Sequence, residues 1–275
     1  MRSMMLRGTY TIILIGLLVY IAVCVMTYLR QRQLLYYPTP RPQVELIQPP
    51  GSVFKIEEMS VSSGEETLRL WRLNPGHDQA VLYYGGNSEE VLYGRELFEE
   101  LFKDRTVYLT NYRGYSGSSG SPSEKGFYED GLSVYDAITA DHQSIAIIGR
   151  SIGSAVATHV AARREVERVV LVTPMDSVEA LAQAVYPLLP VKWLLKDRFH
   201  STHDATLMTS PVLVVIAADD MIVPRQNTDR LIETMGKAEV QVVVVADEDH
   251  ITIATSSRYV QALRSFFNLT VSSMQ

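Results

Sequence analysis

The chain has 275 residues, and one serine lies in a setting suited to nucleophilic catalysis. Ser151 lies in the sequence GRSIG (149–153), between a predicted strand and a predicted helix rich in small residues. Flanking glycines allow the tight turn that lifts a serine hydroxyl above a sheet, because neighbouring backbone can pass without meeting a Cβ atom. The N-terminus of the following helix would favour negative charge developing beside it. Ser151 is therefore the candidate nucleophile for attack on a carbonyl carbon.

A serine nucleophile needs a general base, and the base needs a carboxylate that orients it. Both residue types follow Ser151, in loops after predicted strands, where the reactive groups of an open parallel sheet belong. Asp220 lies in AADDMIVP (217–224), and His250 ends the sequence DEDH (247–250) before the last predicted helix. We predict that His250 is the base and Asp220 its carboxylate. Alternative carboxylates are Asp219 and Asp176, and the histidines with less suitable positions are His77, His142, His159, His200 and His203.

Acyl transfer also needs hydrogen-bond donors for the oxyanion that forms in the transition state. The backbone N–H after the nucleophile, that of Ile152, is the first expected donor. The second is expected in the loop YGGNS (84–88), where two glycines allow an amide to point at the site, so Asn87 is predicted. An ordinary glycine turn into a helix is the alternative interpretation of this loop.

The N-terminal part of the chain contains an apolar run long enough to cross a bilayer. Residues 9–29 carry no charge, and 21 residues at about 1.5 Å each span roughly 30 Å. Residues 1–8 form a short flank, and Tyr28, Tyr36 and Tyr37 suit the membrane interface. We expect an uncleaved single-pass anchor that contacts the lipid bilayer. A cleaved signal peptide is the alternative, but its apolar region usually has only about 7–15 residues.

After this run, residues 30–52 are expected to form a juxtamembrane linker. Five of the twelve prolines of the chain lie between residues 38 and 50, which favours an extended, stiff backbone. The globular body is expected at residues 53–275.

In the body, predicted strands alternate with predicted helices. Several strands, such as those at 212–216 and 242–246, are continuous apolar runs typical of strands covered on both faces. The first two strands alternate in polarity and should be antiparallel at an edge. This order indicates an α/β fold with a mostly parallel eight-stranded sheet flanked by helices. Strands are expected at 53–61, 67–73, 80–84, 106–111, 145–149, 169–173, 212–217 and 240–246, and helices at 89–102, 128–139, 152–164, 228–235 and 253–267.

Composition excludes several classes of protein. With 47% hydrophobic and 20% charged residues, the chain is not of the disordered type. A net charge of −6 argues against nucleic acid as a partner. The single cysteine, Cys24, allows neither an intramolecular disulfide nor a thiolate metal site.

These residues together resemble the α/β-hydrolase superfamily, and within it the small-cap, membrane-anchored serine hydrolases of the serine aminopeptidase-like and acyl-protein thioesterase-like branches. The resemblance covers about residues 34–267. Its most specific stretch is NYRGYSGSSGSP (111–122), similar to the family pattern N/D-Y-R-G-Y-G-x-S-x-G-x-P. DMIVP (220–224) matches D-x-x-V/I-P, which favours Asp220 over Asp219. The resemblance implies an α/β-hydrolase fold and a covalent acyl-enzyme mechanism that needs no metal or organic cofactor.

Three positions depart from the family pattern. Gly85 replaces a usual histidine, Ala217 a common glycine before the acid, and Asp249 a glycine that often precedes the catalytic histidine. None removes a triad atom. The Gly85 departure is expected to loosen the oxyanion loop.

An insert of about residues 178–210 precedes the seventh predicted strand. It is interpreted either as a small apolar cap over an acyl-binding pocket that faces the membrane, or as a helical insertion that covers part of the core. The sequence thus predicts a membrane-anchored serine hydrolase of a small-molecule or acylated ester or thioester. The alternatives are an aminopeptidase-like amide hydrolase, with Glu179, Glu248 or Asp249 binding the substrate amine, and a catalytically idle binding module.

Overall fold

The computed structural model describes residues 2–42 and 55–269. In this part of the chain the sheet has eight strands in the order β1-β2-β4-β3-β5-β6-β7-β8. The first two neighbouring pairs in this order, β1 with β2 and β2 with β4, are antiparallel. All the other neighbouring pairs are parallel. The predicted α/β fold with an antiparallel edge is therefore confirmed. The strands are β1 (Ile56–Ser63), β2 (Glu66–Leu73), β3 (Gln79–Tyr84), β4 (Thr106–Thr110), β5 (Ser144–Arg150), β6 (Val169–Val172), β7 (Val212–Ala217) and β8 (Val240–Val245).

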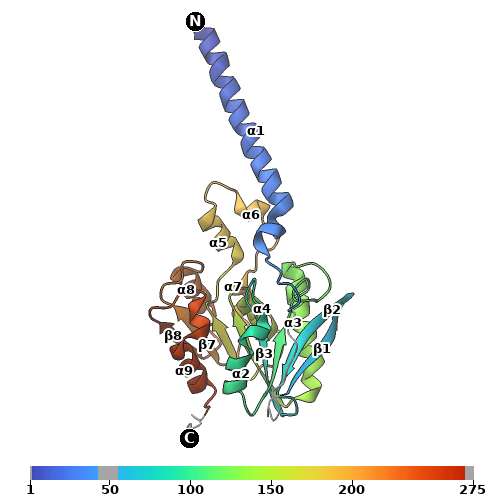
Figure 1. Ribbon diagram of the computed structural model, residues 1–275. Coiled ribbons are helices and arrows are strands. Elements are labelled where there is room, and N and C mark those ends of the chain that lie inside the picture. Colours follow the sequence, from blue (N-terminus) through green and yellow to red (C-terminus); the bar gives the residue numbers. More distant parts are fainter. Residues whose placement is uncertain (1, 43–54, 270–275) are drawn as a thin grey trace.

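Helices cover both faces of the sheet (Figure 1). One core cluster includes side chains of α3, α4, α7 and α8, and a second includes side chains of α2 and α9. The predicted helices at 89–102 and 253–267 each begin with a separate 3₁₀ turn. The helices of the body are η1 (Val91–Gly94), α2 (Arg95–Leu101), α3 (Glu124–Ile138), η2 (Thr139–Asp141), α4 (Ile152–Ala161), α8 (Arg225–Thr234), η3 (Thr252–Thr255) and α9 (Ser257–Phe266).

Burial separates the central strands from the last one. Every residue of β4, β6 and β7 is buried, as continuous apolar runs predict. The same prediction for β8 is wrong, because β8 lies at the edge of the sheet and Val242 and Val244 are 42% and 46% exposed.

The N-terminal helix α1 (Arg2–Leu35) is long and apolar enough to cross a membrane, and in the window that meets this test none of it is buried inside the protein. It rises away from the body in Figure 1. It ends six residues beyond the predicted boundary at residue 29, because RQRQLL (30–35) consists of good helix formers. The predicted linker has neither helix nor strand from residue 36 to 42. Its remainder, like the predicted start of the body at residue 53, lies outside the described residues.

The insert before β7 divides into two parts. Its first two helices, α5 (Val178–Val185) and α6 (Val191–Leu194), stand beside the lower end of α1 (Figure 1). Its third helix, α7 (Ser201–Ala205), packs on α4 and α8 in the body. Both interpretations of the insert thus have a structural counterpart: α7 covers core, and α5 and α6 project from it.

Candidate active site

Ser151 occupies the turn between β5 and α4. Its φ of 53° and ψ of −120° place a non-glycine residue in a sparsely populated region, as expected of a nucleophile held on a strained strand-to-helix turn. The Ser151 N–H donates to the carbonyl oxygen of Val172 at 2.9 Å, which ties the turn to β6.

The two glycines of GRSIG allow the backbone of the turn to pack closely. A Cβ atom on Gly149 would lie 2.4 Å from the carbonyl oxygen of Gly153. A Cβ atom on Gly153 would lie 2.1 Å from the carbonyl oxygen of Tyr84 and 2.5 Å from that of Gly85. Glycine at position 153 thus brings α4 against the predicted oxyanion loop (84–88).

The three residues predicted for nucleophilic catalysis lie within hydrogen-bonding distance of one another. His250 Nε2 is 2.9 Å from Ser151 Oγ, and His250 Nδ1 is 2.8 Å from Asp220 Oδ2. The other carboxylate oxygen, Asp220 Oδ1, accepts the N–H groups of Ile222 at 2.9 Å and Val223 at 2.7 Å. Because the side chains of His250 and Asp220 are 11% and 4% exposed, little water competes for these bonds. Such an arrangement can move a proton from a serine hydroxyl to the imidazole.

The alternative carboxylates and histidines lie elsewhere. Asp176 accepts Ser177 N at 2.8 Å, Asn227 Nδ2 at 2.8 Å and Arg230 Nε at 2.7 Å, so it joins the insert to α8. The exposed Asp219 donates its N–H to the carbonyl oxygen of Glu248. Of the remaining histidines, the side chains of His142, His159 and His200 contact Tyr108, Asp204 and Glu179 respectively, and backbone groups of His77 and His203 bond to Thr106 and Thr206.

The predicted oxyanion loop lies against the nucleophile. A Cβ atom on Gly86 would be 3.6 Å from Ser151 Cβ. The Gly86 N–H donates to Glu89 Oε2 at 2.7 Å, whereas no partner for the Asn87 N–H is found within residues 2–42 and 55–269. Ile152 begins α4, and the first N–H groups of a helix have no partner within it. The amides of Asn87 and Ile152 are thus the two that the sequence predicts and that remain available.

Two tyrosines of NYRGYSGSSGSP (111–122) brace this loop, a role that the sequence did not reveal. Tyr112 donates its hydroxyl to the carbonyl oxygen of Gly85 at 3.0 Å, and Tyr115 donates to Asn87 Oδ1 at 2.7 Å. Burial raises the pKa of both phenols, so they remain donors at neutral pH. These bonds hold the loop at Gly85, where a missing histidine was expected to loosen it.

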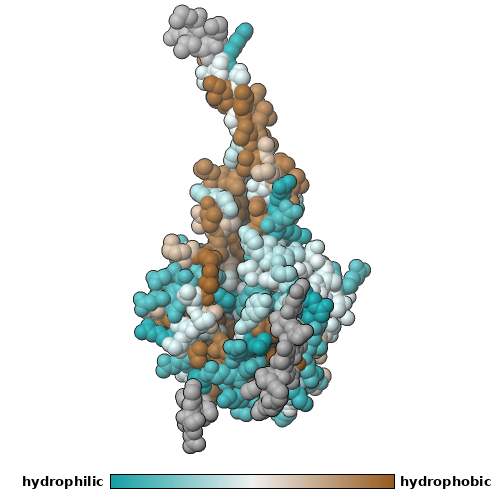
Figure 2. Space-filling view, in the orientation of Figure 1, coloured by the Kyte–Doolittle hydropathy of each residue, from teal (hydrophilic) through white to brown (hydrophobic). Residues whose placement is uncertain are grey.

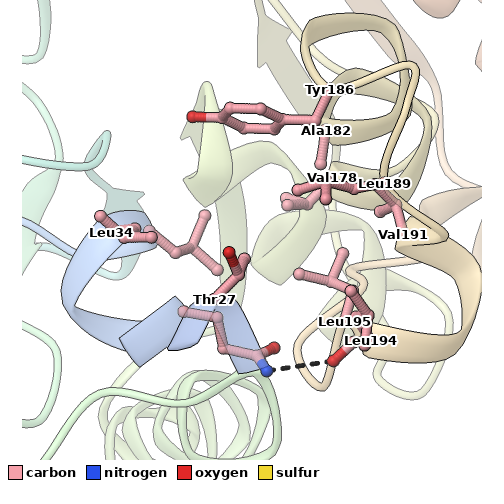
Figure 3. A pocket seen from close by; sticks show the side chains of 11 residues that line it. Thr27, Leu34, Val178, Ala182, Tyr186, Leu189, Val191, Leu194 and Leu195 are labelled. Atoms are coloured by element: carbon pink, nitrogen blue, oxygen red, sulfur yellow. Dashed lines mark hydrogen bonds between the residues drawn. The ribbon is translucent and has the colours of Figure 1, made fainter. Parts of the chain in front are cut away.

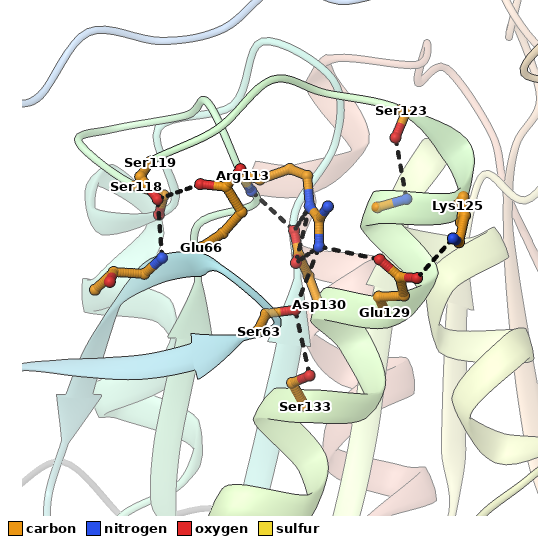
Figure 4. Close-up of polar contacts among 12 residues, drawn as sticks. Ser63, Glu66, Arg113, Ser118, Ser119, Ser123, Lys125, Glu129, Asp130 and Ser133 are labelled. Carbon is orange, nitrogen blue, oxygen red and sulfur yellow. Dashed lines mark hydrogen bonds and ion pairs between the residues drawn. The ribbon is translucent and has the colours of Figure 1, made fainter.

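The same motif is joined to the body by Arg113 (Figure 4). Its guanidinium group binds the fully buried Asp130 of α3 through Nε at 3.1 Å and through a terminal nitrogen at 2.7 Å. The Arg113 N–H donates to the same carboxylate at 2.9 Å. The motif that gives the resemblance its specificity therefore supports the site without touching the serine.

Glu89 and Arg150 form a second support that was not predicted. The carboxylate of Glu89 accepts Tyr83 Oη at 2.7 Å as well as the Gly86 N–H, and it pairs with Arg150 at 3.2 Å. Arg150 also donates to the carbonyl oxygen of His250 at 3.1 Å. One arginine thereby links the oxyanion loop to the loop that carries His250.

Asp249 shapes the turn beside His250. The backbone N–H groups of Thr252 and Ile251 donate to its carboxylate and hold the pKa of Asp249 below its usual range. An aspartate thus fixes the turn where the family often has glycine. Among the described residues, no group of three or more histidine, cysteine, aspartate or glutamate side chains is arranged to hold a metal ion.

The chain is similar in sequence to a protein family and to known proteins. The model of the serine hydrolase family matches residues 132–261, which contain Ser151, Asp220 and His250. An uncharacterized protein of Mycobacterium tuberculosis is 30% identical over 255 residues, covering 88% of this chain and 89% of the relative. The chain belongs to the α/β-hydrolase superfamily. It is also 26% identical to alpha/beta hydrolase domain-containing protein 17C of Xenopus tropicalis, over 72% of this chain and 64% of that protein.

Solved α/β-hydrolase structures share the fold. Esterase Pf2001 of Pyrococcus furiosus superposes with a TM-score of 0.66 and 18% identity, over 85% of this chain and 97% of the esterase. Acetyl xylan esterase of Paenibacillus sp. R4 superposes with a TM-score of 0.67 and 16% identity, over 83% of this chain and 88% of that structure. At 16–18% identity, these two structures show that the chain has the same fold.

Proposed function

We propose that this protein is a membrane-anchored serine hydrolase that cleaves a carboxylic ester or thioester through a covalent acyl-enzyme. The hydrogen-bonded series Ser151, His250 and Asp220 is the observation that carries the proposal. Ser151 Oγ attacks the carbonyl carbon while its proton passes to His250 Nε2. Asp220 keeps the imidazole in the required tautomer and stabilises the imidazolium ion. The N–H groups of Ile152 and Asn87 bind the oxyanion.

The tetrahedral intermediate then collapses, and the bond from the carbonyl carbon to the leaving alkoxide or thiolate breaks. His250 gives its proton to that leaving group, so the acyl group remains on Ser151. A water molecule, deprotonated by His250, next attacks the acyl carbon. The bond from that carbon to Ser151 Oγ breaks, His250 returns the proton to Oγ, and the carboxylic acid is released. No redox step occurs, and the chain's own residues account for every proton transfer.

The lower end of α1 supports an anchor that remains attached. Arg32 Nε binds Asp197 Oδ2 at 2.7 Å, and Gln31 Oε1 accepts the N–H of Lys196 at 2.6 Å. Tyr36, directly after the helix, is buried in the main core cluster. A cleaved signal peptide would take these contacts with it, so the contacts favour a single-pass anchor.

The aminopeptidase alternative receives less support. Glu179 already faces Arg198 at 3.4 Å and His200 at 3.5 Å, and Asp249 accepts the amides of its own turn. Both carboxylates thus have partners, although no hydrogen bond reaches Glu179 Oε2. The third candidate, Glu248, has no ion pair or side-chain hydrogen bond among the described residues, so it is the carboxylate on which this alternative still depends.

Labelling with a fluorophosphonate probe tests the proposed nucleophile. The full chain in membranes should react covalently, and Ser151→Ala should abolish the reaction because the probe needs an activated hydroxyl. Ser265→Ala, an exposed serine of α9, is the matched control and should label like wild type. Absence of labelling of the folded wild-type protein, with another serine hydrolase reacting in the same membranes, would support the idle binding module.

Arg150 offers a test of the supporting contacts. Arg150→Met should lower kcat by roughly 10- to 100-fold with little change in KM, because loss of the link lets the His250 loop shift relative to Ser151. Arg150→Lys should recover part of kcat. Arg225→Met, which removes an exposed arginine paired only with Asp229, should stay within about twofold of wild type. An unchanged kcat in Arg150→Met would exclude the positioning role.

A further inference from the structure

A cavity of about 180 Å³ lies between the lower end of α1 and the α5–α6 insert. Thr27, Leu34 and Leu35 line it from α1, and Val178 and Ala182 from α5. Figure 3 shows these two walls with their side chains facing the space between them. Gln31 also lines the cavity, but its amide group is already hydrogen-bonded. Its Nε2 donates to the carbonyl oxygens of Tyr28 and Leu194, and its Oε1 accepts the N–H of Lys196. The walls are therefore apolar.

The insert lies beside the apolar part of α1. Tyr20 Oη donates to the carbonyl oxygen of Leu188 at 2.9 Å, whereas the Lys196 ammonium lies 4.1 Å from the ring centre of Tyr28. An aromatic ring with a lysine suits the membrane interface. Tyr20 precedes Tyr28 by eight residues. The tip of the insert (residues 186–193) therefore reaches about 12 Å farther along α1 than the contact between Lys196 and Tyr28. If Tyr28 marks the interface, this tip lies among acyl chains.

The tip has the surface that such a position requires. Its large side chains are exposed: Leu188 is 84% exposed and Trp193 81%, and Tyr186, which also lines the cavity, is 53% exposed. Apolar surface continues from α1 onto the insert beside it (Figure 2). A patch of this kind on a water-exposed surface would be unfavourable, and it marks a contact with lipid or protein.

The backbone carbonyl groups of the tip are also satisfied internally. Gln183 Nε2 donates to the carbonyl oxygens of Tyr186, Pro187 and Leu189 at 3.3–3.4 Å, and Tyr20 to that of Leu188. The carbonyl oxygen of Pro190 accepts the N–H groups of Trp193 and Leu194. All five carbonyl groups from 186 to 190 thus have donors, and two of the five residues are prolines without an N–H. A hydrocarbon environment favours such pairing of carbonyl groups, although the N–H of Leu188 has no partner among the described residues.

The α1 wall of the cavity is also bonded to the proposed oxyanion loop. Asn87 Nδ2 donates to the carbonyl oxygen of Leu35 at 2.6 Å, and Asn87 Oδ1 accepts the N–H of Tyr37 at 3.1 Å. A cavity wall is therefore bonded directly to the proposed oxyanion loop, whose Gly86 lies against Ser151.

We propose that the cavity between α1 and the α5–α6 insert receives the acyl chain of a membrane-resident ester or thioester, which reaches Ser151 without leaving the bilayer. The proposal rests on the hydrolase function above. A cavity of about 150 Å³ holds a benzene molecule, so this one takes roughly six carbons of the chain, and the rest lies along α1. The anchor is accordingly one wall of the substrate site as well as a tether.

Alkyl fluorophosphonates of different chain length test this proposal on the full chain in phosphatidylcholine vesicles. Wild type should label at least about tenfold faster with a hexadecyl than with an ethyl probe, because each buried methylene adds affinity. Ala182→Phe fills the cavity and should remove most of this preference, because the hexadecyl chain loses its binding site. Ala184→Phe, on the exposed face of the same helix, is the matched control and should keep the preference.

The outcomes separate the two proposals. Absence of Ser151-dependent labelling by the ethyl probe would overturn the hydrolase function. Ser151-dependent ethyl labelling of wild type, together with an unchanged chain preference in Ala182→Phe, would overturn the cavity proposal alone. If Ala182→Phe fails to fold, Leu34→Ala, which enlarges the cavity from the opposite wall, should change the chain preference instead. An unchanged preference in that variant would likewise overturn the proposal.

Trp193 reports on the depth of the tip. Vesicles with brominated acyl chains should quench its fluorescence, and the quenching should disappear in Trp193→Phe, since the other tryptophan, Trp71, is buried in the sheet. Equal quenching of wild type and Trp193→Phe would place the tip outside the acyl region and would overturn entry from the bilayer.

Discussion

Ser151→Ala should lower kcat for an ester or thioester by about 10⁴-fold or more, because the remaining groups bind and polarise the substrate without a nucleophile. Asp220→Asn should also lower kcat by about 10⁴-fold, since an amide favours the wrong imidazole tautomer at the Nδ1 contact of 2.8 Å. The double variant should be no slower than Ser151→Ala. Single-turnover kinetics on purified full-length protein would measure all three.

Two aspartates serve as controls for this prediction. Asp219 is exposed beside Asp220, so Asp219→Asn should stay within about twofold of wild type. Asp176→Asn should weaken the contact with Arg230 and lower stability, while the folded fraction keeps its kcat. A larger loss in Asp219→Asn or Asp176→Asn than in Asp220→Asn would show that the acid has been assigned to the wrong residue.

The sequence predicted the strands and the residues of the site because both depend on local patterns. Buried strands such as β7 are continuous apolar runs, and the carboxyl ends of parallel strands lie at one edge of the sheet. Residues as distant as Ser151 and His250 therefore meet once the strand order is right. The exposure of β8 depends on its place at the edge, which its own run of valines does not encode.

The contacts that support the site were beyond prediction for a different reason. Tyr20 and Leu188 are 168 residues apart, and Asn87 and Leu35 are 52 apart. No period in the sequence relates such pairs, because a helix pattern specifies its own apolar stripe and leaves the partner open. The end of α1 was expected to lead into a free spacer, and the structure instead joins it to the oxyanion loop.

These contacts give α1 three separate roles. Its apolar stretch can hold the protein at a membrane, its last turns form a wall of the cavity, and its final carbonyl group, that of Leu35, accepts a hydrogen bond from Asn87. Truncation of α1 would disturb all three at once. Substitutions in the cavity, at Arg150 and at the triad are therefore more informative than deletion of the helix.

Gly153→Ala should have the largest effect on stability, and it should reduce activity at the same time. The added Cβ would lie 2.1 Å from the carbonyl oxygen of Tyr84 and 2.5 Å from that of Gly85. Both are backbone atoms, so α4 and the oxyanion loop must separate. Overpacking of this kind typically costs about 1–3 kcal/mol and occasionally more, which lowers the midpoint of thermal unfolding by roughly 5 °C or more.

The activity loss follows from the same displacement. A shift of about 1 Å between the nucleophile and its oxyanion donors can reduce kcat by about 10²-fold. Gly236→Ala is the control, because a Cβ there meets no atom within 4 Å, and it should leave both stability and kcat close to wild type. Thermal unfolding and labelling by the ethyl probe would be measured on the same samples. A Gly153→Ala protein that unfolds at the wild-type temperature but labels slowly would mean that the loop moves freely, so the bonds from Tyr112 and Tyr115 would not be rigid supports.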